Sequence, residues 1–182
     1  MEEKHIKLSR FLSLVLRHKP EEIGLALDSE GYLFVDELID GINSTGRNID
    51  KKMLDEIINS DNKKRYSYDI TGTMIRANQG HSVKVDLGLQ ETTPPTVLYH
   101  GTSEQFANEI EHLGLIKKLR THVHLSEDIE TAKNVGSRRK GNLVILKINA
   151  EQMAKDGYKF YRSENGVWLT DNVPTKYLSI VK

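Results

Sequence analysis

The spacing of apolar residues changes sharply in the first half of the chain, and this change restricts the folds that the chain can adopt. Three stretches, residues 8–16, 35–42 and 53–58, repeat apolar residues every three or four positions, as helices with one buried stripe do. Lys19-Pro20 ends the first helix, and Asp50 is placed to cap the third. Residues 65–70 and 74–78 then have the pattern of two strands joined by the turn Thr71-Gly72-Thr73. Three helices followed by a hairpin are the order of a winged helix, a helix-turn-helix variant that often contacts nucleic acid.

A threonine- and proline-rich segment, Thr92-Thr93-Pro94-Pro95, is the best linker candidate in the chain. We therefore expect two domains, over residues 1–90 and 91–182. In the second domain short strands alternate with short helices, and the helices end near Gly114 and Gly136. Strands are expected at residues 97–99, 122–125, 143–148, 158–161, 167–169 and 177–181. The whole chain is thus expected to belong to the α+β class.

Composition excludes several classes of protein. Of the 182 residues 37% are hydrophobic, so at least one packed core is feasible. Cysteine is absent, which excludes disulfides, thiolate catalysis and cysteine-ligated zinc. No apolar run is long enough to cross a bilayer, and the acidic, polar start of the sequence does not resemble a secretory signal. We expect a soluble, cytoplasmic monomer, with no membrane and no protein partner implied.

The net charge is zero, so a non-specific binder of polyanions is not indicated. Basic residues nevertheless gather in three places: Lys63-Lys64-Arg65, Lys117-Lys118 with Arg120, and Arg138-Arg139-Lys140. Such clusters are usually solvated loops, whereas clusters that converge in space form a compact anion site. The sequence leaves both interpretations open.

Two groups of basic residues in the first half are candidates for phosphate chemistry. Arg17-His18 lies at the end of the first helix, where cations complement the helix dipole; the same pair can bind a phosphate and transfer a proton. Arg65 opens the first strand of the hairpin, where an exposed edge charge is also common.

In the second half, His100-Gly101-Thr102 ends a strand, and a glycine there allows a ligand to approach the backbone closely. His122 and His124 have the spacing of residues on one face of a strand, and a His-x-His pair can ligate a metal. No acidic or cysteine partner has suitable spacing, so no metal site is expected.

Seven short segments follow one another along nearly the whole chain. They are Leu14-Val15-Leu16-Arg17-His18, Asp28-Ser29-Glu30-Gly31-Tyr32, Lys63-Lys64-Arg65-Tyr66, Gln79-Gly80-His81-Ser82, Tyr99-His100-Gly101-Thr102, His122-Val123-His124-Leu125-Ser126 and Glu164-Asn165-Gly166-Val167-Trp168-Leu169. In content and order they resemble the RNA 2′-phosphotransferase family, best known for the last step of tRNA splicing. Each segment is modest by itself, and the coincidence of all seven is what makes the resemblance specific.

The resemblance implies a winged-helix lobe that binds RNA bearing a 2′-phosphate, and a second lobe of the ADP-ribosyltransferase fold. It implies that NAD binds in the second lobe and is consumed as a co-substrate. It further implies a catalytic quartet, here Arg17, His18, Arg65 and Arg120. The NAD-binding residues expected on the same grounds are His100, Gly101, Thr102, His124, Leu125, Ser126 and Arg138.

One difference from toxin-like ADP-ribosyltransferases is informative. Those enzymes use a His, a Tyr or Ser, and a Glu that activates the acceptor; the corresponding positions here are His100, His124 and Val167, with Glu164 nearby but out of register. A missing Glu would impair transfer to a weak nucleophile such as a hydroxyl. A phosphate monoester has a second pKa of about 6 and is already largely dianionic at neutral pH, so it needs positioning rather than a base.

The resemblance therefore implies a two-step reaction that yields nicotinamide, ADP-ribose 1″,2″-cyclic phosphate and RNA with a free 2′-hydroxyl. Two other classes stay open at this point. One is an ADP-ribosyltransferase that leaves a stable ADP-ribose on a nucleic-acid phosphate. The other is a winged-helix regulator without enzymatic activity, although a regulator would not require the His-Gly-Thr and His-x-His-Leu-Ser segments.

Overall fold

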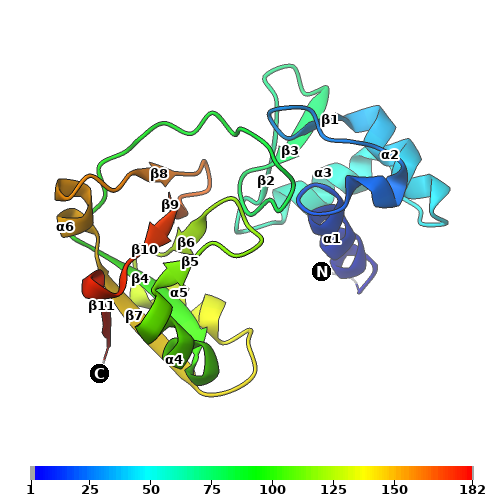
Figure 1. Ribbon diagram of the computed structural model, residues 1–182. Helices are drawn as coiled ribbons and strands as arrows, with labels where there is room; N and C mark the ends of the chain where they lie inside the picture. Colours follow the sequence, from blue (N-terminus) through cyan, green and yellow to red (C-terminus); the bar gives the residue numbers. More distant parts are fainter. Residues whose placement is uncertain (1–2, 182) are drawn as a thin grey trace. The chain divides into compact units, whose positions relative to one another are not determined.

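The computed structural model describes residues 3–181 and divides the chain into two compact units, Met1–Gly88 and Leu89–Lys182 (Figure 1). Each unit has its own hydrophobic core. Six α-helices and several small antiparallel sheets occur among the described residues. The expected mixture of helices and small sheets is confirmed, whereas the winged-helix and ADP-ribosyltransferase assignments of the two units stay predictions.

The first unit contains the three predicted helices and the predicted hairpin. Its elements are α1 (Glu3–Val15), the 3-10 helix η1 (Pro20–Ile23), β1 (Tyr32–Phe34), α2 (Val35–Ser44), α3 (Lys51–Asn59), β2 (Tyr66–Tyr68) and β3 (Met74–Ala77). Asp50 caps α3 as expected, because its carboxylate accepts a hydrogen bond of 2.7 Å from the backbone N–H of Met53. The first helix ends at Val15, a turn before Lys19-Pro20, and Pro20 begins η1 instead.

Strand β1 was not predicted from the sequence, because three residues are too few to show an alternating pattern. It pairs with β3, which lies in the middle of the sheet β1-β3-β2. The carboxylate of Asp28 accepts hydrogen bonds from the N–H groups of Glu30 and Tyr32. These bonds stabilise the turn that leads into β1. The inward face of the sheet packs on the helices through buried side chains, among them Leu33, Ile75 and Ala77.

The second unit alternates short strands and helices. Its elements are β4 (Val97–Ser103), α4 (Glu104–Leu113), β5 (Leu115–Ile116), β6 (Val123–Leu125), α5 (Ile129–Gly136), β7 (Leu143–Asn149), α6 (Ala150–Lys155), β8 (Phe160–Arg162), β9 (Trp168–Thr170), β10 (Asn172–Val173), η2 (Thr175–Tyr177) and β11 (Leu178–Ile180). They form two three-stranded sheets, β11-β7-β4 and β6-β9-β8, and the pair β10-β5. The six predicted strands and the two predicted helices are present, whereas α6, β5 and β10 were not predicted.

The two three-stranded sheets meet at one point, where β4 and β6 exchange backbone hydrogen bonds. The N–H of Tyr99 donates to the carbonyl of Ser126 and the N–H of Ser126 to the carbonyl of Tyr99, each at 2.8 Å. His100 follows Tyr99 directly and His124 lies two residues before Ser126, and both line the cavity of the candidate site.

The predicted linker segment belongs to the second unit in the structure. The N–H of Thr92 donates to the carbonyl of Phe160 (2.8 Å), and Glu91 forms an isolated bridge with Tyr161. Throughout residues 3–181, no helix combines the length and the apolar character needed to span a membrane.

Candidate functional site

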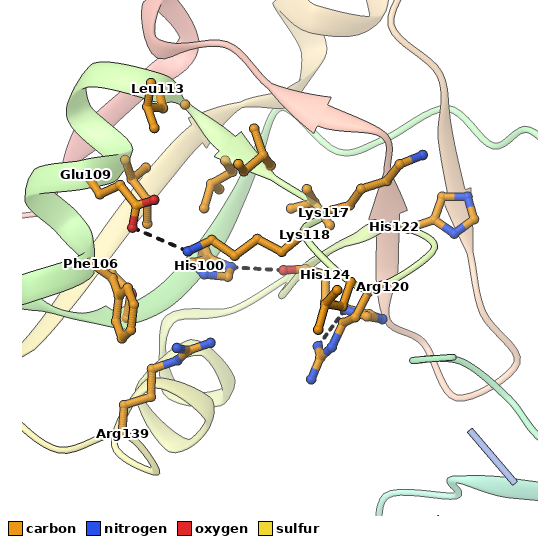
Figure 2. A pocket seen from close by; sticks show the side chains of 17 residues that line it. His100, Phe106, Glu109, Leu113, Lys117, Lys118, Arg120, His122, His124 and Arg139 are labelled. Atoms are coloured by element: carbon orange, nitrogen blue, oxygen red, sulfur yellow. Dashed lines mark hydrogen bonds and ion pairs between the residues drawn. The ribbon is translucent and has the colours of Figure 1, made fainter. Parts of the chain in front are cut away.

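A cavity of about 310 Å³ opens in the second unit between β4, α4 and the segment that leads into β6 (Figure 2). Four of the predicted site residues line it: His100, Thr102, Arg120 and His124. The segment from Gly114 to Arg120 forms one side, and Lys118 within it has a left-handed backbone with a φ of 53°. The fold thus brings together at one cavity four predicted residues that lie up to 24 positions apart in the sequence.

Two hydrogen bonds fix the imidazole rings at the point where the sheets meet. His100 Nδ1 lies 3.0 Å from the carbonyl oxygen of His124, and because a carbonyl only accepts, this nitrogen carries a proton. Arg120 Nη1 lies 2.8 Å from His124 Nδ1, and because a guanidinium only donates, this nitrogen carries the lone pair. Figure 2 shows both contacts. In the neutral rings Nε2 of His100 is therefore an acceptor and Nε2 of His124 a donor, a complementary pair for a ligand with hydroxyl groups.

The cavity is strongly cationic. Burial lowers the pKa of Arg120, and the charges of Arg139 and Arg138 lower it further. Burial also lowers the pKa of His100, against the bond to His124, which raises it. A bound anion offsets the electrostatic repulsion between partly buried cations. This arrangement is therefore suited to a phosphate or pyrophosphate group.

An aromatic ring adjoins these charges. Arg139 and Lys118 both lie over Phe106. The Arg139 guanidinium carbon is 4.7 Å from the ring centroid, and the Lys118 ammonium nitrogen is 5.1 Å from it. Lys118 also forms a 3.3 Å ion pair with Glu109 of α4. Phe106, Glu109 and Arg139 were not among the predicted site residues. Phe106 thus holds two cationic side chains in the cavity region by attraction to its ring face.

Gly101, Leu125, Ser126 and Arg138 do not line the cavity. Gly101 has a packing role, because a Cβ atom there would come within 1.8 Å of the carbonyl oxygen of Ala132 in α5. Leu125 is buried in the core, and Ser126 makes the bridge between the two sheets. Arg138 acts on the cavity through its charge on Arg120, while the next residue, Arg139, lines it.

In the first unit, Arg17 and His18 are held by the segment that follows the hairpin. The N–H of Ser82 donates to the carbonyl of Arg17 (2.9 Å), and the hydroxyl of Ser82 lies 2.9 Å from His18 Nδ1. The Arg17 side chain passes over Gly80, where a Cβ atom would lie 3.7 Å from the guanidinium. The motif Gln79-Gly80-His81-Ser82 therefore fixes both residues.

Arg65 precedes β2 and is oriented by the nearly buried carboxylate of Asp61. This carboxylate accepts hydrogen bonds from the N–H groups of Lys63 (3.2 Å) and Arg65 (2.7 Å) and pairs with the Arg65 guanidinium. A guanidinium has five N–H donors, so an arginine held in this way can still bind a phosphate. Asp61 is thus a positioning residue that sequence reasoning missed.

His81 belongs to the motif Gln79-Gly80-His81-Ser82, but no role in the site was predicted for it from the sequence. Its side chain is fully buried, and neither ring nitrogen has a hydrogen-bond partner among the described residues. Burial lowers its pKa to about 4, with contributions from the charges of Arg17, His18 and Arg76. Two arginines, Arg17 and Arg76, and the His18 imidazole are therefore close enough to the buried His81 ring to affect its protonation.

The structure gives no ligand set for a metal ion. Within the part of the chain that is described, no group of three or more His, Cys, Asp or Glu residues could hold one.

His122 lies just before β6 and packs edge-on against Tyr161, with 5.7 Å between ring centroids. Glu164 lies in the turn between β8 and β9, and Val167 immediately precedes β9.

Comparisons with known proteins cover both units. A sequence profile described as "RNA 2′-phosphotransferase, Tpt1 / KptA family" matches residues 3–172. A Fusobacterium nucleatum protein named "Probable RNA 2′-phosphotransferase" is 53% identical over 176 residues, covering 97% of this chain and 98% of that protein. Proteins of the same name from Flavobacterium johnsoniae and Escherichia coli are 52% and 48% identical, over 94% and 93% of this chain and 93% and 92% of their own lengths.

Proposed function

Because the chain belongs to the RNA 2′-phosphotransferase family, we propose that it removes a 2′-phosphate from RNA by transferring it to NAD. The observation that best supports the use of NAD is the cationic cavity of the second unit, where Arg120 donates to His124 beside His100. Arg120, Arg139 and the charge of Arg138 suit a pyrophosphate, and the two imidazoles suit ribose hydroxyls. A cavity of this size, with Phe106 and apolar side chains in its wall, would enclose part of a dinucleotide.

In the first step of the proposed reaction, an oxygen of the RNA 2′-phosphate attacks the anomeric carbon of the nicotinamide ribose. The bond from this carbon to nicotinamide breaks, and the transition state resembles an oxocarbenium ion. The phosphate dianion is already a nucleophile, so the chain needs no Glu in place of Val167. Arg17 and Arg65 would hold the phosphate in place.

In the second step, the neighbouring ribose hydroxyl attacks phosphorus and the bond from phosphorus to the RNA 2′-oxygen breaks. The products are ADP-ribose 1″,2″-cyclic phosphate and RNA with a free 2′-hydroxyl. Charge builds on the phosphoryl oxygens, and guanidinium groups such as Arg65 and Arg120 stabilise it. The leaving oxygen requires a proton, for which His18 is our candidate, since the contact with Ser82 fixes its ring.

The finer assignments belong to the same proposal. They are a winged-helix fold for the first unit, an ADP-ribosyltransferase fold for the second, a role in tRNA splicing, and action as a cytoplasmic monomer. The alternative is a transferase that leaves ADP-ribose on a nucleic-acid phosphate, because the His100–His124 pair would suit that reaction equally. Product analysis separates the two, since only the phosphotransferase returns unmodified RNA.

The test is a reaction of the purified protein with a 2′-phosphorylated oligoribonucleotide, with and without NAD and with a metal chelator. We expect phosphate removal to require NAD, to release one nicotinamide for each phosphate removed, and to proceed in the chelator. Equal activity without NAD, or loss of activity in the chelator, would contradict the proposal. An RNA that keeps its ADP-ribose at the end of the reaction would support the alternative.

A further inference from the structure

The sheet of the first unit has a second face that the core does not use. Along each strand side chains alternate between the two faces. Leu33, Ile75 and Tyr66 point inward and are buried, so their neighbours point outward. We call these neighbours the outer face; they are Tyr32, Phe34, Ser67, Met74 and Arg76.

The outer face combines aromatic rings with one arginine at its centre. Arg76 of β3 pairs in register with Tyr32 on one side and with Ser67 on the other. Its guanidinium carbon lies 4.7 Å from the centroid of the Tyr32 ring. Phe34, two residues along β1 from Tyr32, is 54% exposed, so its ring is accessible beside that of Tyr32.

This face continues into the residues proposed to bind the phosphate. The N–H of Asn78 donates to the carbonyl of Arg65 (2.8 Å), so the β2–β3 ladder extends one pair beyond β2. By alternation the Arg65 side chain lies on the same side as Ser67 and Arg76. Arg76 is also near enough to His81 for its charge to lower the pKa of this ring together with those of Arg17 and His18.

We propose that the outer face binds the single-stranded RNA next to the 2′-phosphate, with a base stacked on Phe34 and Tyr32 and a backbone phosphate on Arg76. This inference rests on the proposed function, since it assumes that Arg65 and Arg17 hold the 2′-phosphate. Unpaired bases stack on aromatic rings whatever their sequence, and arginine binds the phosphate beside them. A protein partner could also contact the apolar rings. Its binding would not require Arg76 to lie on the same side of the sheet as the phosphate-binding residue Arg65.

The test measures binding of a labelled 2′-phosphorylated heptaribonucleotide to the full chain by fluorescence anisotropy, without NAD and at several salt concentrations. The variants are Phe34→Ala and Arg76→Gln. The chain offers matched controls for both: Arg47, whose guanidinium lies 3.6 Å from the Phe11 ring centroid, and Ile70, which is fully exposed at the hairpin tip. Arg47→Gln removes an arginine that also lies over an aromatic ring, and Ile70→Ala removes an exposed apolar side chain, both away from the outer face. Thermal melting confirms that each variant is folded.

The two variants are expected to differ in kind. Phe34→Ala should weaken binding roughly 5- to 100-fold, as loss of one stacked base does, and leave the salt dependence unchanged. Arg76→Gln should weaken binding and reduce the slope of log K against log salt by about 0.7, the value for one contact with a single-strand phosphate. An RNA with an abasic sugar beside the phosphate should bind both the wild type and Phe34→Ala with the same reduced affinity.

The outcomes separate the inference from the function on which it rests. If the wild type binds the RNA and both variants bind it as tightly, the outer face has no role, while the proposed function stands. If Arg47→Gln or Ile70→Ala weakens binding as much as its counterpart, the effect is not specific and the inference is wrong. If the wild type does not bind the RNA, both the outer face and the proposed function are contradicted.

Discussion

The contact between His18 and Ser82 determines which ring nitrogen of His18 can act on a substrate. Its Nδ1 lies 2.9 Å from the hydroxyl of Ser82, which leaves Nε2 as the nitrogen that can reach a substrate. The same residue can either transfer a proton or only orient the phosphate. These two roles affect different steps of the proposed reaction, so one variant distinguishes them.

We predict that His18→Ala still releases nicotinamide and accumulates RNA carrying a 2′-phospho-ADP-ribose adduct. The first step needs no general acid, whereas loss of one in the second step should slow it roughly 10²–10⁴-fold. Nicotinamide and the RNA adduct are followed in parallel over time. Arg17→Ala and Arg65→Ala are the comparison, since both should impair the two steps together. If His18→Ala loses nicotinamide release as severely as phosphate removal, His18 orients the phosphate instead.

His81 provides a prediction for stability. Its pKa falls from 6.5 to about 4 on folding, chiefly because the ring is buried. Between these values the unfolded chain binds a proton that the folded chain does not, so the free energy of unfolding decreases as the pH falls. We expect His81 to contribute a loss of about 2 kcal/mol between about pH 7 and about pH 5. Urea unfolding of the wild type and of His81→Gln measures it; equal pH dependence in the two would show that His81 is not held neutral.

At the level of elements, the close packing of β4 against α5 determines the geometry of the cavity. A Cβ atom at Gly101 would lie 1.8 Å from the carbonyl oxygen of Ala132, and one at Gly136 would lie 2.8 Å from the carbonyl carbon of Gly101. His100 and Thr102, on either side of Gly101, both line the cavity. The backbone contact therefore holds two site residues in place although Gly101 does not line the cavity.

We predict that Gly101→Ala destabilises the protein by more than about 3 kcal/mol, because the added methyl group meets backbone that cannot move aside. Gly157→Ala is the matched control in the same unit: its φ is 92°, but nothing lies within 4 Å of the added methyl group. It should cost only the roughly 1–2 kcal/mol of a left-handed backbone. Chemical denaturation of both variants gives the comparison, and a Gly101→Ala loss no larger than that of Gly157→Ala would refute the packing role.

The elements also show which parts of the fold can be predicted from the sequence. Helical stripes of apolar residues predicted α1, α2 and α3, and turn residues placed the β2–β3 hairpin. The two- and three-residue strands β1, β5 and β10 are too short to give a pattern, and they form because longer-range pairing holds them. The helix α6 was not predicted, although Asn149 caps it: the Asn149 side-chain oxygen accepts a 3.2 Å hydrogen bond from the N–H of Gln152.

For the site, local motifs indicated His100, Thr102, Arg120 and His124, which line one cavity. Asp61 was not predicted, and His81 was quoted in a motif without a role, because the significance of both depends on burial, which a polar residue in a loop does not reveal. Gly101 was selected for ligand approach, which stays a prediction, and the structure shows its close contact with the backbone of α5, a segment about thirty residues away. The sequence thus indicated candidate residues for the proposed chemistry, and the structure identifies the residues that contact and orient them.

For the molecule as a whole, the proposed chemistry is divided between the two units. Arg17, His18 and Arg65 belong to the first unit, and Arg120 with the cavity belongs to the second. The proposed reaction requires both, because the phosphate comes from RNA and its acceptor from NAD. Its central claim is therefore that the phosphate itself passes from one substrate to the other and is not hydrolysed.

Tracing the phosphorus atom tests this claim most directly. An oligoribonucleotide with a radiolabelled 2′-phosphate is incubated with the full chain and NAD, and the labelled products are separated. The account predicts that all of the released label appears in ADP-ribose 1″,2″-cyclic phosphate while the RNA regains a free 2′-hydroxyl. Label released as inorganic phosphate, in the presence or absence of NAD, would contradict it.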